Sequence, residues 1–460
     1  MWMIHGTRIA ILSTLGVAIL SRPSVAHVGG LSGTVTSTAV PTWVTILTGG
    51  VIVGASFMFT SLMTDHASIR AINEWRLPVP TSDTVRKAFR WTIRGASIGV
   101  LFTILVTGFT GPEDPMSNFA ILIVWAGWWA GYTVSVYVFG NTWPILNPWR
   151  TIVELVPTTP RVTYPASLGA WPSVVALLGL VCLEVVSPVA ENAQLLASLI
   201  LGYSVVTLAG ATLFGADTWF GRVDPISRVF HCYGRLAPLQ RTENGFELKL
   251  PSATLAEQRV AERSDDVAFI IALLWVTTYD GFVSTPLWAE VARPVVSVGV
   301  PALLLYVMTI VIGFGVFFFV YRLASRRARQ SGRTYVTSEF IEGWFAPSLL
   351  PIAAGYHIAH FLGYFLTLTP ALLSVLGQPF SPPADVQVLV IPGWFPTVQL
   401  AFVLLGHLFA VWVAHALAFD LFPGKLKPIR SQYPFIVVMI FYTMTSMWVV
   451  TQPFTQPPYV

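Results

Sequence analysis

Ten stretches of about 17 or more mostly apolar residues, each long enough to cross a bilayer as a helix, dominate this sequence. Lipid offers no hydrogen-bond partners to an irregular backbone, so a crossing segment must be a helix or part of a closed barrel. We therefore predict an all-α fold, a polytopic membrane bundle of about ten transmembrane helices. The stretches are residues 40–64, 95–111, 119–139, 173–189, 193–215, 267–283, 294–321, 344–368, 396–419 and 434–451.

The composition agrees with a chain that lies in lipid. Hydrophobic residues make up 54% of the sequence and charged residues 10%, whereas an average soluble domain carries about 25% charged residues. These proportions exclude a soluble cytosolic enzyme and a disordered chain. Cys182 lies in an apolar stretch and Cys232 in a basic segment, which excludes a disulfide-based scaffold. We expect the lipid bilayer to be the main partner.

The first 26 residues have the pattern of a secretory signal peptide. Arg8 precedes an apolar segment at 9–20 that is too short to span a bilayer comfortably, and Ser24 and Ala26 provide small residues for a cleavage site. Cleavage after Ala26 would make His27 the first residue of the mature chain. The alternative is an uncleaved anchor helix.

The basic residues predict the orientation of the bundle. If the mature N-terminus lies outside, the inside segments hold 23 of the 26 Lys and Arg residues, Arg293 is outside, and Arg8 and Arg22 belong to the signal peptide. Such an excess is typical of cytoplasmic loops. We predict a plasma-membrane protein with its mature N-terminus and its C-terminus outside. Because the net charge of +4 reflects topology, we expect no nucleic-acid partner.

The longest hydrophilic segment divides the predicted helices into two sets of five. We predict a signal peptide at 1–26, a first membrane half at 27–215, a cytoplasmic loop at 216–266 and a histidine-bearing second half at 267–460. The alternation in residues 245–250 predicts one short strand in this loop. Five helices per half would give the halves opposite orientations, as in many secondary transporters.

Intramembrane histidines are the first candidate site, since ionisable residues are expensive in lipid. His357 and His360 share a helical face. They are expected about 16 Å and 12 Å below the outer end of their helix, and His407 about 16 Å below the outer end of the next helix. Three imidazoles at one depth suit copper, zinc or haem iron, with His415 two turns further along as an assisting group. Alternatively, these histidines only hydrogen-bond neighbouring helices.

Copper is the favoured cofactor. Haem b is less favoured because no helix carries the His pair, 13 or 14 residues apart, of dihaem bundles, although one haem held by His407 with His357 or His360 remains open. After cleavage, His27 would offer its α-amine and Nδ1 to one copper ion. The alternative for His27 is an exposed terminus that binds nothing.

A second candidate site surrounds Asp280. The sequence Thr277-Thr278-Tyr279-Asp280-Gly281 is typical of a locally unwound helix end that lines a cavity, or else of an interfacial cap. Glu184 also falls near the outer end of its stretch. We expect Asp280, Glu184 and Tyr279 to be cavity or proton-relay residues if the protein is a transporter.

Six short motifs occur along the chain in the following order: Ala26-His27-Val28, Asn147-Pro148-Trp149-Arg150, Asp280-Gly281-Phe282, Ala359-His360, Gly406-His407 and Ser431-Gln432-Tyr433. In this order the motifs resemble those of a family of polytopic membrane proteins from actinobacteria and haloarchaea. His357 lies outside the shared pattern, which favours His360, His407 and His415 over it as ligands. Some members carry the label fenitrothion hydrolase, so the resemblance implies a multi-helix membrane fold and a membrane hydrolase as a further candidate.

Three hypotheses follow. The first is a metal-binding membrane protein, active in metal handling or as a membrane component of an oxidoreductase. The second is a secondary transporter or permease with an intramembrane site around Asp280. The third is a membrane hydrolase, although the sequence has no motif of the soluble hydrolases.

Overall fold

The structure is a computed structural model that describes residues 41–80, 83–156, 159–242, 245–257, 261–383, 386–453 and 455–458. Within these ranges, nine helical segments are long and apolar enough to cross a membrane. They are α2 (Thr42–Leu62), α4 (Asp83–Thr110), the run of α5 (Phe119–Leu122), η2 (Ile123–Tyr132) and α6 (Thr133–Phe139), α10 (Ala193–Phe214), α14 (Ser264–Val283), α16 (Ala302–Gly332), the run of α17 (Ser338–Phe345), η5 (Ala346–Leu349) and α18 (Leu350–Gly377), α19 (Phe395–Leu421) and α20 (Leu426–Thr451).

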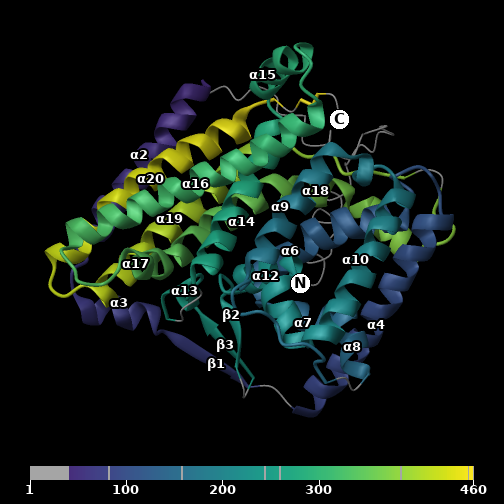
Figure 1. Ribbon diagram of the computed structural model, residues 1–460, viewed down its shortest axis with the longest axis horizontal. Helices are drawn as coiled ribbons and strands as arrows, with labels where there is room; N and C mark the ends of the chain where they lie inside the picture. Colours follow the sequence, from purple (N-terminus) through teal and green to yellow (C-terminus); the bar gives the residue numbers. More distant parts are fainter. Residues whose placement is uncertain are drawn as a thin grey trace, which may run out of the picture.

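The predicted fold class is confirmed. The tenth apolar stretch forms α9 (Trp171–Val186), a shorter apolar helix, so every predicted crossing segment is helical. The predicted signal peptide and His27 lie outside the described residues. The chain is a multi-pass, all-α membrane protein, and its helices are packed as one bundle (Figure 1).

Two helix boundaries differ from those predicted. The stretch 294–321 is broken: α15 (Pro286–Ser297) is a separate helix and α16 starts at Ala302, because Gly299 has a φ of 95° and Pro301 precedes the new helix. The eighth segment does not end at 368 but continues to Gly377, with Pro370 inside α18. His357 and His360 therefore lie 20 and 17 residues before the Gly377 end of α18, farther from that end than predicted.

α14 is the central helix of the bundle. Within its most apolar stretch of 18 residues, 78% are buried inside the protein, compared with 11% for the corresponding stretch of α16. α14 packs against α9, α16 and α18. Between Leu303 and Phe319 most exposed side chains of α16 are large and apolar, among them Val311, as expected for a helix that faces lipid.

The first crossing helix packs far from its neighbours in sequence. α2 lies against α19 and α20 at the C-terminal end of the chain (Figure 1). Two glycines permit this approach: a Cβ on Gly49 would lie 2.9 Å from Cγ of Met447, and a Cβ on Gly50 would lie 3.1 Å from Cγ of Met444. Small residues at such contacts are common in membrane helix pairs.

One end of the bundle, here called the loop face, carries a small antiparallel sheet (Figure 1). Its strand order is β1-β3-β2. Leu248 of the central strand β3 lies opposite both Leu77 of β1 and Leu239 of β2. β3 confirms the strand predicted in residues 245–250. The strands are β1 (Arg76–Pro80), β2 (Leu239–Thr242) and β3 (Gly245–Lys249).

Short helices surround the sheet or join the crossing segments. On the loop face, α8 and α12 frame a pocket described below, and α15 lies at the opposite end of the bundle (Figure 1). The short helices are α3 (His66–Asn73), α7 (Trp143–Leu146), α8 (Pro148–Leu155), η3 (Pro188–Ala190), α11 (Ala216–Thr218), η4 (Trp219–Val223), α12 (Pro225–Gly234) and α13 (Ala253–Glu257).

Candidate functional site

The two predicted sites meet at one ion pair inside the bundle. Nε2 of His360 on α18 lies 3.1 Å from Oδ2 of Asp280 on α14. The side chains are 26% and 20% exposed, so the pair is partly accessible although it lies between packed helices. His360, a candidate metal ligand, and Asp280, a candidate relay residue, thus belong to a single site.

The predicted unwinding at Asp280 is wrong. α14 is a regular helix as far as Val283. Two hydroxyl groups near this end bond back to carbonyls of the helix: the Thr278 hydroxyl donates to the Leu274 carbonyl at 3.1 Å, and the Ser284 hydroxyl donates to the Asp280 carbonyl at 3.2 Å. Hydroxyl groups bonded in this way stay in a helix without breaking it.

Gly281 lets α18 approach α14 beside the ion pair. The Tyr356 hydroxyl occupies the place that a Cβ on Gly281 would take. Tyr356 is buried, its hydroxyl has no protein hydrogen-bond partner, and its ring stacks at 6.2 Å on that of His360. Tyr364, one turn beyond His360, completes this face of α18 with a second buried hydroxyl that lacks a partner.

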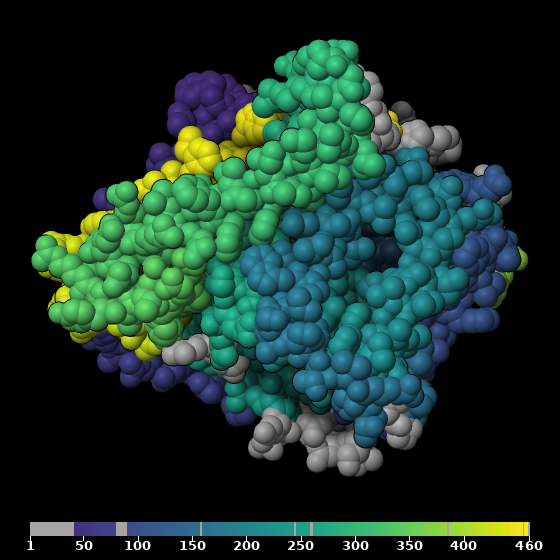
Figure 2. Space-filling model, in the orientation of Figure 1, coloured from purple at the N-terminus to yellow at the C-terminus, as the bar shows by residue number. Residues whose placement is uncertain are grey.

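Glu184 on α9 adds a second carboxylate. It interacts electrostatically with Asp280 and with Tyr364, and α9, which carries it, borders a hollow in the molecular surface (Figure 2). We call Glu184, Asp280, His360, Tyr356 and Tyr364 the acid–histidine cluster. It joins one helix of the first half to two helices of the second.

Tyr279 takes a different position from its neighbour Asp280. Its ring is buried against Trp275, at a centroid distance of 5.8 Å, and its hydroxyl donates to the Tyr306 carbonyl at 3.3 Å. The side chain therefore joins α14 to α16.

His357 points away from the helix that carries His407. α18 meets α19 through Gly355 and Ala359, whereas the His357 ring lies 5.3 Å from that of Trp129 and 5.8 Å from that of Tyr233. The imidazole is fully buried, and neither ring nitrogen has a hydrogen-bond partner in the protein.

His407 is buried on α19. Its Nδ1 lies 2.8 Å from the Val403 carbonyl, and its Nε2 has no partner. A Cβ on Gly355 would lie 3.0 Å from Cα of Gly406, so the antiparallel register places His407 about six residues from the level of His360. That is roughly 9 Å along the helix axis.

The structure does not bring the three imidazoles together at one depth. Among the described residues, no group of three or more His, Cys, Asp or Glu side chains is arranged to hold a metal. The depth estimate from sequence failed because it used an end of α18 at 368, nine residues before the true end at Gly377.

His415 has both ring nitrogens engaged. Nε2 lies 2.9 Å from the Met63 carbonyl, and Nδ1 lies 3.3 Å from Nε2 of Gln432, which is itself fully buried. His415 therefore connects α19 to α20 and to the end of α2. This is the helix-bonding role that was the alternative to a ligand.

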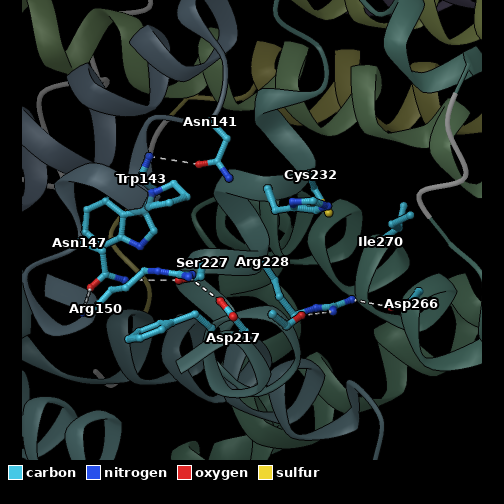
Figure 3. Close-up of a pocket in the computed structure, with 14 residues that line it drawn as sticks. Asn141, Trp143, Asn147, Arg150, Asp217, Ser227, Arg228, Cys232, Asp266 and Ile270 are labelled. Carbon is cyan, nitrogen blue, oxygen red and sulfur yellow. Dashed lines mark hydrogen bonds and ion pairs between the residues drawn. The ribbon is translucent and has the colours of Figure 1, made fainter. Parts of the chain in front are cut away.

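A separate pocket of about 260 Å³ opens on the loop face (Figure 3). Arg150 donates to Glu154 at 2.7 Å and to Asp217 at 2.5 Å, and Arg228 donates to Asp266 at 2.9 Å. The pocket lining also includes Asn141, Trp143, Asn147, Ser227, His231 and Cys232.

Asn147 begins the helix that frames this pocket. Its Oδ1 accepts from the backbone N–H of Arg150 at 2.9 Å, and Pro148 occupies the first helical position of α8. An Asn-Pro pair of this kind is a helix-start signal that could have located α8 from sequence. The pocket itself was missed because its lining comes from segments far apart in the chain.

Charge and burial change two pKa values near this pocket. Burial would raise the pKa of Glu154, but hydrogen bonds and charge from Arg150 and Arg94 outweigh it and hold that pKa below its ordinary value. Burial raises the pKa of the Cys232 thiol to about 11. Cys232 therefore remains a neutral thiol at physiological pH.

The fold and the acid–histidine cluster define a class: a multi-pass α-helical membrane protein with ionisable side chains between its helices. No family model, no curated protein and no solved structure matches the chain.

Proposed function

We propose that this protein is a proton-coupled secondary transporter of the plasma membrane, in which Asp280 and His360 bind and release the coupling proton. The observation that carries the proposal is the 3.1 Å contact between Nε2 of His360 and Oδ2 of Asp280. Ionisable side chains within a membrane bundle are costly, and they mark ion pathways and proton relays.

Two features of the cluster support proton binding. Glu184 places a second carboxylate within electrostatic range of Asp280, so the cluster holds two acids and one imidazole. Gain or loss of a single proton therefore changes the net charge of the cluster. His360 and Asp280 are also partly accessible, which proton exchange requires.

The location of the cluster supports transport. Glu184 is on α9, while Asp280 and His360 are on α14 and α18, so the cluster joins the two predicted membrane halves. In many secondary transporters the coupling site lies where two structural repeats meet. A change in the charge of such a site alters the contact between the halves.

The proposal is tested by charge movement in proteoliposomes on a solid-supported membrane. A pH jump should produce a transient current in the wild-type protein, and Asp280→Asn or His360→Gln should remove it. Asp420→Asn is the matched control, because Asp420 is an exposed carboxylate at the loop-face end of α19. Absence of a current from the wild type, or a full current from Asp280→Asn, would contradict the proposal.

A metal or haem bound by His407 is a second candidate function. With Nδ1 bonded to the Val403 carbonyl, the lone pair of Nε2 is directed into the buried interior without a partner, the state in which an imidazole ligates a metal. Copper or haem b would supply redox chemistry there. His27, if it is the mature N-terminus, would be a ligand of a separate copper ion.

Metal analysis and an optical spectrum of the purified protein test this candidate. We expect about one copper or haem per chain, lost in His407→Ala and retained in His415→Ala, since both nitrogens of His415 already have partners. The absence of both copper and haem from the purified wild-type protein would refute this candidate.

A further inference from the structure

Three buried titratable rings lie between the loop-face pocket and the acid–histidine cluster. They are Tyr137 on α6, Tyr233 on α12 and His357 on α18. Ring centroids are 5.0 Å apart for Tyr137 and Tyr233, 5.8 Å for Tyr233 and His357, and 6.0 Å for Tyr137 and His357. The three rings form one compact group at the meeting point of three helices.

This group carries more polar atoms than a packing role requires. The buried hydroxyls of Tyr137 and Tyr233 interact with each other. Among the described residues these hydroxyls have no other hydrogen-bond partner, and the two nitrogens of His357 have none. Phe230 and Phe361, which also lie in this aromatic region, fill the same kind of space without polar atoms. Buried polar groups in proteins are hydrogen-bonded, to ordered water where the protein provides no partner.

The group reaches the loop-face pocket at one end. Tyr233 directly follows Cys232, which lines the pocket (Figure 3). The next residue, Gly234, packs on Asn141, another lining residue: a Cβ on Gly234 would lie 2.6 Å from Cβ of Asn141. Tyr233 therefore lies immediately behind the pocket wall.

The other end reaches the ion pair. His357 precedes His360 by three residues on α18, and both imidazoles contact the Phe361 ring, at centroid distances of 4.7 Å and 4.8 Å. The two imidazoles also interact electrostatically. From the pocket to Asp280, successive titratable groups are therefore neighbours.

We propose that Tyr233, Tyr137 and His357 form a proton route between the loop-face pocket and the Asp280–His360 pair, an inference that rests on the proposed transport function. Each hydroxyl or imidazole accepts a proton on one side and releases one on the other. No group is oxidised or reduced, and each returns to its starting charge. The titratable groups around His357 in this route are the two tyrosines and His360.

The test compares pH jumps applied to the two faces of the protein. Vesicles are sorted by the accessibility of a tag on the C-terminus, and the transient current is recorded with either the loop face or the opposite face outward. We expect Tyr233→Phe and His357→Phe to slow the current at least tenfold when the jump reaches the loop face. The current after a jump at the opposite face should keep its wild-type rate.

Tyr442→Phe is the matched control, because Tyr442 is also buried with an unpartnered hydroxyl but lies on α20, outside the route. Tyr233→Phe removes one hydroxyl, whose protein neighbour is the Tyr137 hydroxyl, and keeps the ring, so we expect the variant to fold with a melting temperature close to that of the wild type.

A wild-type current from Tyr233→Phe at both faces would overturn the route, and so would equal slowing at both faces. Failure of the transport proposal is distinct, since the wild-type protein would then give no current at either face. A full current in Asp280→Asn would likewise contradict the transport proposal.

Discussion

At the scale of single residues, the four histidines of α18 and α19 have four different environments. His360 faces a carboxylate, His415 has partners at both nitrogens, His407 at one, and His357 at none. The sequence predicted all four to lie in crossing segments, and the structure places them in α18 and α19. Their roles depend on which neighbouring helix each imidazole faces, and this information is not contained in their spacing along the chain.

Cys232 provides a prediction at this scale. Because burial raises the pKa of its thiol to about 11, and the thiolate is the reactive form, we expect slow alkylation by N-ethylmaleimide at pH 7.5. The rate should rise about tenfold per pH unit up to pH 10. The measurement is mass spectrometry of the Cys182→Ser protein, in which Cys232 is the one remaining cysteine. A rate that stays constant between pH 7 and pH 9 would contradict the neutral thiol.

At the scale of helices, contacts between small residues and one buried ion pair set the packing. α18 and α19 meet through Gly355 and Gly406, while Arg94 near the start of α4 reaches Glu154 of α8 at 2.5 Å. Neither contact could be predicted from sequence, because each joins residues from different segments. The helices themselves could be predicted, because their apolar length follows directly from the thickness of the bilayer.

Replacing Gly355 with alanine should destabilise the α18–α19 contact. The new Cβ would lie 2.5 Å from the Phe402 carbonyl oxygen and 3.0 Å from Cα of Gly406, and overpacking of this kind costs about 1–3 kcal/mol. We expect a lower melting temperature in detergent. Gly179→Ala is the control, since a Cβ there meets no atom within 4 Å. Equal melting temperatures for the two variants would show that the close approach is unimportant.

Glu154→Gln should also lower the melting temperature at pH 7, because it leaves the buried Arg94 guanidinium without its counter-charge. We expect a loss of about 1–3 kcal/mol. The folded state holds the pKa of Glu154 below its ordinary value of 4.5, so the stabilisation is present above that pH and disappears as the pH falls below it.

The difference between Glu154→Gln and wild type should therefore be larger at pH 7 than at pH 3.5. The exposed Glu113 provides the control variant Glu113→Gln. A difference that is independent of pH would assign the effect to packing and not to charge.

At the scale of the whole molecule, the apolar stretches predicted about ten crossing helices. The structure confirms their helical type, and in the part of the chain that it describes nine helices are long and apolar enough to cross, while the tenth stretch forms the shorter α9. The packing of α2 against α19 and α20 could not be predicted, since apolar helix faces look alike in sequence. The same limit applies to the sheet, in which β1 and β3 are separated by more than 160 residues. Similarly, Asp280 and His360 were both selected, but their pairing depends on how α14 packs against α18.

The orientation of the molecule remains a prediction from its basic residues. Tyr335 is fully exposed between α16 and α17 on the loop face, and Val298 is exposed between α15 and α16 at the opposite end. In a background without Cys182 and Cys232, we expect Tyr335→Cys to react with a membrane-impermeant maleimide only in inverted vesicles. Val298→Cys should react in intact cells, and the reverse result would invert the topology.

The edge strand β1 is an extended connection across the loop face of the molecule. The segment from α3 to α4 leads from α2, which lies against α19 and α20, to α4, which lies against α10, and β3 clamps it midway. An extended strand is already close to its maximum length, so residues 76–80 cannot lengthen when the helices move. Any motion that parts the two helix groups at this end must therefore be taken up outside β1 or must break its pairing with β3.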